Sequence, residues 1–221
     1  MTVPTPSGLM HLRTWLDRDV DVARFSQWCD GHQVEQLVVP GIRRVRRFSL
    51  WRSAGEAAPD SLTMYDLDHL DVLASDAFAD LRRRSTGLPE FLAGRLRAVR
   101  CDAWLVEGVP AVAGLTGGGE ALAHLFVDEG DDLADWFAEA GLPLLDAAGA
   151  TTGRLLRSAQ GEQVVLVEID RADPDLDPAS LPVPPTSAAG DGATPGWGIY
   201  RLDFLATPEG ESHSPHLDRE G

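Results

Sequence analysis

The chain has 221 residues, enough for one large domain or two small ones, and its 43% hydrophobic content indicates a soluble globular protein. The formal net charge of −16 argues against nucleic acid and against anionic membranes as partners. All nineteen basic residues are arginine. The absence of lysine excludes Schiff-base chemistry on lysine, lysine-bound pyridoxal phosphate and a P-loop lysine.

The remaining compositional signals concern the compartment. The N-terminus lacks the basic start and the apolar stretch of a signal peptide, and no apolar run reaches the ~20 residues of a membrane helix. The two cysteines, Cys29 and Cys101, form no CxxC pair, which points to a reducing compartment and to no structural zinc site. We expect a cytoplasmic protein without a membrane partner.

The first half of the chain predicts a series of six elements. A period-2 alternation predicts a strand over residues 8–15, and apolar residues spaced by three and four predict an amphipathic helix from Val22 that ends at Pro40-Gly41. Two strands forming an antiparallel pair, a helix and a fourth strand are then expected over 42–51, 62–68, 69–85 and 95–106. The order β-α-β-β-α-β is that of the split ferredoxin-like unit.

The second half repeats this pattern in outline. Strands are expected at 121–128, 164–170 and 197–206, with a helix over 131–149 and an LRSA stretch at 156–159 that echoes WRSA at 51–54. A polar, proline-rich loop, 171–196, stands where the second helix would be. We therefore expect an α+β fold of two ferredoxin-like βαββαβ repeats, the second degenerate, over 1–114 and 115–206, with a frayed polar tail at 207–221. Chance similarity between two α+β stretches is the alternative.

Several short motifs of the first 106 residues resemble the EthD-like branch of the dimeric α+β barrel superfamily. They are W-x-D-x-H-x-x-E from Trp28 to Glu35, VPG at 39–41, RRF at 46–48 and YDLD at 65–68. The resemblance implies that two repeats, normally on two chains, are fused here into one intramolecular barrel, either as a monomer or as a homodimer. It leaves the reaction open, because relatives include isomerases, cyclases, decarboxylases, cofactor-free monooxygenases and, more distantly, heme enzymes.

His32 is the first candidate catalytic residue. Imidazole titrates near neutral pH, and Glu35, three residues on, lies on the same helical face and could orient or charge it. The structural alternative is a histidine that merely benefits from the negative end of its helix. The repeat lacks an equivalent, since Pro143 occupies the corresponding position and Val167 takes that of Tyr65, so one functional pocket is expected.

The first strand supplies a second group of candidates. His11, Arg13 and Trp15 share one face, and Met10 and Leu12 suit the side that packs on the helices. Facing a barrel interior, the three would provide a base, an anion clamp and a stacking surface. A hydrogen-bonded core histidine is the alternative for His11.

The remaining candidates come from later strands and from the first helix. Tyr65 could donate a hydrogen bond to a developing enolate, although simple packing is commoner for a tyrosine at the centre of a strand. Of the arginines at 43, 44, 46 and 47, at most two can face a pocket, and Arg47 is the candidate to bind a carboxylate there. Trp28, Trp51 and Trp104 are candidate aromatic walls, with core packing as the alternative.

No pattern indicates a metal or an organic cofactor. His213 and His216 lie in a polar tail, and the glycines at 117–119 precede a strand, so neither forms a recognised site. We expect a cofactor-independent cyclase, isomerase, dehydratase or decarboxylase acting on an aromatic or polyketide-like small molecule, with His32 and His11 moving protons. The alternatives are a cofactor-free monooxygenase, a non-catalytic binder of an apolar metabolite and, last, a heme protein with His69 or His124 as axial ligand.

Overall fold

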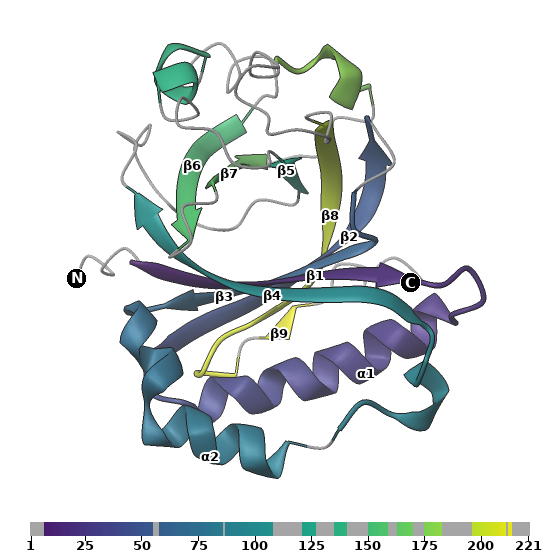
Figure 1. Ribbon diagram of the computed structural model, residues 1–221, viewed down its shortest axis with the longest axis vertical. Coiled ribbons are helices and arrows are strands. Elements are labelled where there is room, and N and C mark those ends of the chain that lie inside the picture. The colour runs from purple at the N-terminus through teal and green to yellow at the C-terminus, as the bar shows by residue number, and fades with distance from the viewer. Residues whose placement is uncertain are drawn as a thin grey trace. The chain divides into compact units, whose positions relative to one another are not determined.

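The alternation at the start of the chain forms strand β1, Gly8–Leu16, as expected. The computed structural model describes residues 7–54, 58–85, 87–107, 121–126, 135–140, 150–158, 163–169, 175–182, 196–210 and 212–213. Over these residues the fold is α+β, with antiparallel strand pairs and few helices (Figure 1). None of the helices in these ranges is long and apolar enough to cross a membrane.

The chain divides into two compact units, each made of more than one segment of the sequence. Unit 1 comprises residues 1–47, 59–103 and 203–221, and unit 2 comprises 48–58 and 104–202. Three long strands contribute residues to both units: β2, Ile42–Ser53, β4, Leu96–Glu107, and β8, Gly196–Ala206.

The sheet of unit 1 has the strand order β2-β3-β1-β4, which is the order of a ferredoxin-like unit. Strand β3, Ser61–Leu67, is buried along its whole length and runs antiparallel to β1. The register sets Met10 opposite Tyr65 and His11 opposite Met64. Because successive side chains of a strand point to opposite faces, Tyr65 and His11 lie on opposite faces of this sheet.

Helix α1, Val22–Val34, begins where the sequence predicts it. The Asp21 side chain accepts a hydrogen bond from the backbone N–H of Arg24 at 3.0 Å and so caps the first turn. A 3-10 turn, η1, Glu35–Val38, continues the helix. Gly41 then turns the chain into β2 with a φ of +92°, and a Cβ added there would lie 2.5 Å from Cγ2 of Val72.

The expected single helix over 69–85 is two pieces. A 3-10 helix, η2, Leu70–Ala74, is followed by helix α2, Asp76–Arg84. Ser75 separates them because its backbone is extended and its hydroxyl accepts the N–H of Phe78 at 3.2 Å, which starts a new helix. A third short turn, η3, Glu90–Leu92, leads into β4. Both α1 and α2 cover one face of the strands of unit 1 (Figure 1).

The strands of unit 2 are β5, Ala121–Phe126, β6, Ala150–Ser158, β7, Gln163–Ile169, and most of β8. Their order, β6-β7-β5-β8, corresponds to the second, third, first and fourth strands of a repeat, as in unit 1. Residues 135–140 are helical and bury Phe137 in an apolar core that also contains Trp197. The rest of the expected helix over 131–149 lies outside the described residues.

The polar segments differ from the expectation in part. Within 171–196 the structure describes residues 175–182 and the start of β8, and it places a 3-10 helix, η4, at Pro178–Ser180. The beginning of the tail is ordered and not frayed, because Gly210 closes a turn on Thr207 and strand β9, Ser212–His213, pairs with Leu205 and Ala206 of β8. Residues 214–221 lie outside the described residues.

Candidate active site

A cavity of about 740 Å³ lies in unit 1 between its sheet and the helices α1 and α2. Its lining combines apolar and aromatic side chains with polar groups, as small-molecule sites do. Strands β1 and β3 and helix α1 all contribute to it: the lining residues from these elements are Met10, Leu12, Thr14, Thr63, Tyr65, Phe25, Trp28, Cys29, His32 and Gln33. The polar and aromatic lining residues include Thr14, Trp28, Cys29, His32, Gln33, Gln36, Thr63, Tyr65, Arg82, Cys101 and Asp102.

His32 and Trp28 form one wall of this cavity. They are four residues apart on α1, and their rings stack with centroids 5.1 Å apart and planes 10° apart. Nδ1 of His32 is buried, has no hydrogen-bond partner within the described part of the chain, and lies 3.7 Å from a carboxylate oxygen of Glu35. Glu35 can therefore stabilise a positive charge on the ring, and the His32 side chain is 25% exposed.

Three weak acids that line the cavity are held in their protonated forms. Burial raises the pKa of Tyr65, and the neighbouring Cys29 and Cys101 raise it further. Burial raises the pKa of Cys29 to about 12 and also raises that of Cys101. At neutral pH these groups therefore donate hydrogen bonds, and the thiols are poor nucleophiles.

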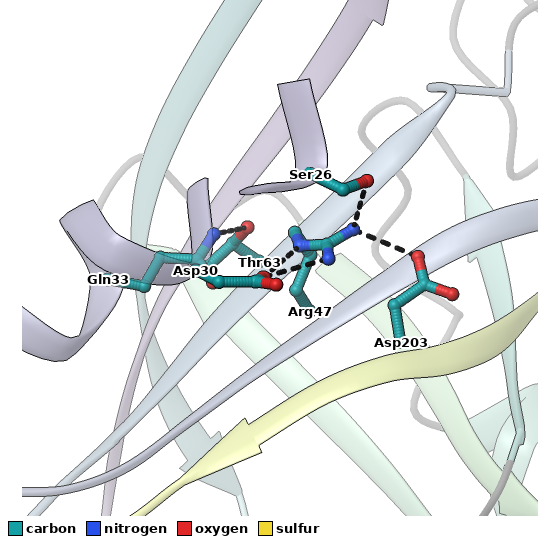
Figure 2. Close-up of polar contacts among 6 residues, drawn as sticks. All are labelled: Ser26, Asp30, Gln33, Arg47, Thr63 and Asp203. Atoms are coloured by element: carbon teal, nitrogen blue, oxygen red, sulfur yellow. Dashed lines mark hydrogen bonds and ion pairs between the residues drawn. The ribbon is translucent and has the colours of Figure 1, made fainter. Parts of the chain in front are cut away.

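Gln33 and Thr63 join the helix to the sheet inside the lining. The amide nitrogen of Gln33 donates a hydrogen bond to the Thr63 hydroxyl at 2.9 Å (Figure 2). Both side chains are buried, and the pair lies on the same face of β3 as Tyr65.

Arg47 does not line the cavity. Its guanidinium donates to Asp30 through Nη2 at 2.8 Å, to Asp203 through Nη1 at 2.9 Å and to the Ser26 hydroxyl at 3.2 Å (Figure 2). Ser26 and Asp30 are one helical turn apart, so this buried arginine attaches α1 to β2. Its donors are taken up by the protein's own carboxylates, and the expected binding of a substrate carboxylate gains no support.

His11 and Arg13 lie on the sheet face opposite Tyr65. His11 is fully buried, and this burial, followed by the charge of Arg13, lowers the pKa of His11 to about 3. Arg13 is paired with Asp102, with Nη2 2.5 Å from the carboxylate. His11 is therefore not among the residues that line the cavity beside His32.

The arginines at positions 43, 44 and 46 of β2 are also paired with carboxylates. Arg44 and Arg46 both contact the buried Asp66, at 2.6 Å and 3.3 Å, and Arg43 is bonded to Asp68. Each of these three guanidinium groups therefore has a carboxylate partner within the protein.

The remaining predicted wall residues lie elsewhere. Trp15 is half-buried at the end of β1 and is not among the residues that line the cavity. Trp51 belongs to unit 2, where the guanidinium of Arg201 lies 3.7 Å from its ring centre and that of Arg52 lies 4.6 Å from it. Trp104 pairs with Ser158 through β4 and β6, and its side chain is outside the described part of the structure.

The sequence analysis missed several lining residues, of which Gln33 and Thr63 are the clearest. A signal was present: Phe25, Cys29 and Gln33 continue one stripe of α1 at intervals of four, so a polar residue occupies an otherwise apolar position. Thr63 lies two residues before Tyr65 and therefore on the same strand face. A polar residue on a buried face needs a partner, which points to a pair or to a ligand.

No group of three metal-ligating side chains converges within the described ranges. The two histidines considered as heme ligands lie in different units. His69 is largely exposed and lies 3.4 Å from the Asp71 carboxylate in unit 1, whereas His124 is buried on β5 in unit 2, with its ring edge-on to Tyr200.

No family model and no curated protein sequence matches the chain. Several solved structures do match the chain. An anthrone oxidase-like protein is 14% identical, with a TM-score of 0.58 over 93% of this chain and 94% of that one. A candidate monooxygenase from Fusobacterium nucleatum subsp. nucleatum is 8% identical, with a TM-score of 0.52 over 96% and 99%. Another from Lactobacillus acidophilus is 9% identical, with a TM-score of 0.50 over 94% and 100%.

These likenesses show the fold. It is an α+β fold with antiparallel strand pairs, in agreement with the fold class expected from sequence. At identities of 14% and below they carry no assignment of reaction or substrate to this chain.

Proposed function

We propose that this chain is a small-molecule enzyme that binds a largely apolar, ring-containing molecule in the cavity of unit 1 and removes a proton from it with His32. The observation that carries the proposal is the stacked Trp28–His32 wall of the cavity, in which Nδ1 of His32 lies 3.7 Å from a carboxylate oxygen of Glu35. The indole and the apolar lining suit a flat ring system.

The lining supports a division of roles. His32 takes a proton from an acidic C–H or O–H bond of the substrate, which gives an imidazolium ion and an enolate or phenolate. Tyr65, kept protonated by its raised pKa, donates a hydrogen bond to the oxygen that carries the new negative charge. Asp102 is a weaker candidate base because its carboxylate is already paired with Arg13.

Two kinds of reaction can follow the removal of this proton. If the imidazolium returns it to another atom of the substrate, the reaction is an isomerisation, or a cyclisation, dehydration or decarboxylation when a bond forms or a leaving group departs. The alternative is cofactor-free oxygenation, in which the anion reduces O2, one oxygen atom enters the substrate and the other leaves as water. The names of the similar structures favour oxygenation. The lining residues do not distinguish the two reactions, because both begin with removal of a proton by His32.

The EthD-like assignment belongs to this proposal. In the Trp28-x-Asp30-x-His32 motif, the aromatic residues line the cavity and Asp30 holds Arg47. Glu35, the last motif residue, is the carboxylate beside His32. Each motif residue thus either lines the cavity or contacts a residue that orients α1 or His32. We infer from this that the chain belongs to the EthD-like branch.

Anthrone, the compound in the name of one similar structure, is a suitable probe because its ring CH2 is acidic. In D2O under nitrogen, the protein should accelerate exchange of that CH2, measured by proton NMR. Replacing His32→Ala should lower the enzymatic exchange rate by at least about 100-fold, since general base catalysis contributes about 10²–10⁴-fold. Replacing the largely exposed histidine, His69→Ala, is the matched control and should leave the rate unchanged.

The same sample then separates the alternatives. Uptake of O2 after air is admitted identifies the oxygenase, whereas exchange without uptake supports proton-transfer chemistry. Unchanged exchange in His32→Ala would show that His32 is not the base. Binding without exchange or uptake would identify a non-catalytic binder.

A further inference from the structure

Gln33 of α1 and Thr63 of β3 are a buried pair of polar residues in the cavity lining. They are hydrogen-bonded to each other, but part of their capacity to form hydrogen bonds is unused. The side chains are 4% and 7% exposed, and they contact each other through the single bond from the Gln33 amide nitrogen to the Thr63 hydroxyl (Figure 2). Neither residue is part of the proton-transfer step proposed above.

The bonding capacity of the pair is only partly used. A glutamine amide has an oxygen that accepts and an NH2 that donates, while a threonine hydroxyl both accepts and donates one hydrogen. Oε1 of Gln33 is buried and has no hydrogen-bond partner in the described part of the chain. Because the Thr63 oxygen accepts from Gln33, its own hydrogen is left to donate. The pair therefore offers one acceptor and one donor side by side.

We propose that Gln33 and Thr63 bind a hydroxyl group of the substrate. A hydroxyl donates its hydrogen to Gln33 Oε1 and accepts the hydrogen of Thr63, so it satisfies both groups at once. An ether, a ketone or a carboxylate accepts only, and it would leave the buried Gln33 oxygen without a donor, which is costly. The inference rests on the proposed function because it concerns the same cavity, and it narrows the substrate class to hydroxylated ring systems.

Specificity follows from the same argument. A site that is built to hydrogen-bond a hydroxyl discriminates strongly against the analogue that lacks it, since its polar groups are then left unpaired. Gln33 follows His32 directly on α1, so the helix that positions the base also positions the hydroxyl-binding amide.

The experiment uses isothermal titration calorimetry of the full chain with three matched probes: 1-naphthol, 1-methoxynaphthalene and naphthalene. The wild-type protein should bind the naphthol at least about tenfold more tightly than its methyl ether, a factor equivalent to about 1.4 kcal/mol. Gln33→Met keeps the length of the side chain and removes the acceptor, so this ratio should fall to within about twofold while naphthalene still binds. Thr63→Val, which removes only the hydroxyl, should act in the same direction. The exposed glutamine of the same helix, Gln27→Met, is the control and should keep the wild-type ratio.

Each other outcome has a definite meaning. Equal binding of all three probes by the wild-type protein leaves the proposed function standing and overturns the hydroxyl site. An unchanged ratio in both Gln33→Met and Thr63→Val also overturns it, because the discrimination would then come from elsewhere. If the wild-type protein binds none of the probes, the proposed ring-binding cavity fails, and the inference that rests on it fails as well.

Discussion

At the scale of single residues, burial determines which ionisable groups can carry chemistry. His11 and His32 are both histidines of unit 1, but His11 is fully buried whereas the His32 side chain is 25% exposed at a cavity. Burial in a low-dielectric interior penalises the charged imidazolium, so His11 stays neutral at physiological pH. Of the two, the cavity residue is the one placed to exchange protons with a ligand.

The lowered pKa of His11 has a consequence for stability. Below the ordinary histidine pKa of 6.5 the unfolded chain binds a proton at this site, whereas the folded chain does so only near pH 3. The unfolded state therefore holds more protons in that window, and stability falls as pH falls from about 6.5 towards 3. We expect His11→Gln to reduce this slope, by up to about 1.4 kcal/mol per pH unit.

Urea unfolding between pH 6.5 and 4.5 measures the effect, with His69→Gln as the exposed control that keeps the wild-type slope. If the slopes of His11→Gln and the wild-type protein coincide, His11 is not the neutral buried group described here.

Single residues also explain why part of the site was predictable. His32, Trp28 and Tyr65 were found because histidine and aromatic residues are informative by type, and all three line the cavity. Gln33 and Thr63 were not predicted, because what distinguishes them is that both are buried and that they hydrogen-bond to each other. This bond joins α1 to β3, and the type of the two residues does not indicate it. The ion pairs of Arg47 could not be read from the sequence for the same reason, since its partner Asp203 is 156 positions away in the sequence.

At the scale of elements, the attachment of α1 to its sheet determines the geometry of the cavity wall. Ser26 and Asp30 contact Arg47 one helical turn apart, and Trp28 and His32 stack at the same spacing on the cavity side. The buried arginine therefore fixes the rotation of the helix about its axis. It acts on the site as a positioning residue, through Trp28 and His32.

Removing this arginine should cost stability. Arg47→Met removes the buried guanidinium that contacts both Asp30 and Asp203, and breaking a buried ion pair in this way costs about 3–5 kcal/mol. Arg83→Met removes an exposed pair with Asp80 and should cost no more than about 1 kcal/mol. Denaturant unfolding of the two variants measures the difference. A loss of naphthol binding in Arg47→Met at undiminished stability would contradict the structural role and restore the sequence expectation of a binding residue.

Elements were predicted well where the pattern is local and less well where it is not. The alternation of β1 and the spacing of α1 are properties of neighbouring residues, and both elements form at the expected positions. The break at Ser75 depends on one hydroxyl capping a new helix, which an apolar period over 69–85 does not reveal. The pairing of β9 with β8 depends on contacts of a polar segment that looked like a free tail.

At the scale of the whole molecule, the two units share a strand order but differ in the side chains at corresponding positions. Tyr65 of β3 lines the cavity of unit 1, whereas its counterpart in β7, Val167, is part of an apolar core in unit 2. The expected counterpart of His32, Pro143, lies outside the described residues. This asymmetry supports a single site, built in unit 1.

The central claim is that a ring-containing molecule binds in unit 1 against the Trp28–His32 wall. The measurement that tests it most directly is an NMR titration of the 23.8 kDa chain with 1-naphthol, observing the indole N–H signals of tryptophan and the ring carbons of histidine. The account predicts that the signals of Trp28 and His32 shift together and saturate with one ligand, while those of His69 remain in place. Shifts confined to residues of unit 2, such as Trp51, or a Trp28–His32 pair that does not respond to bound ligand, would contradict it.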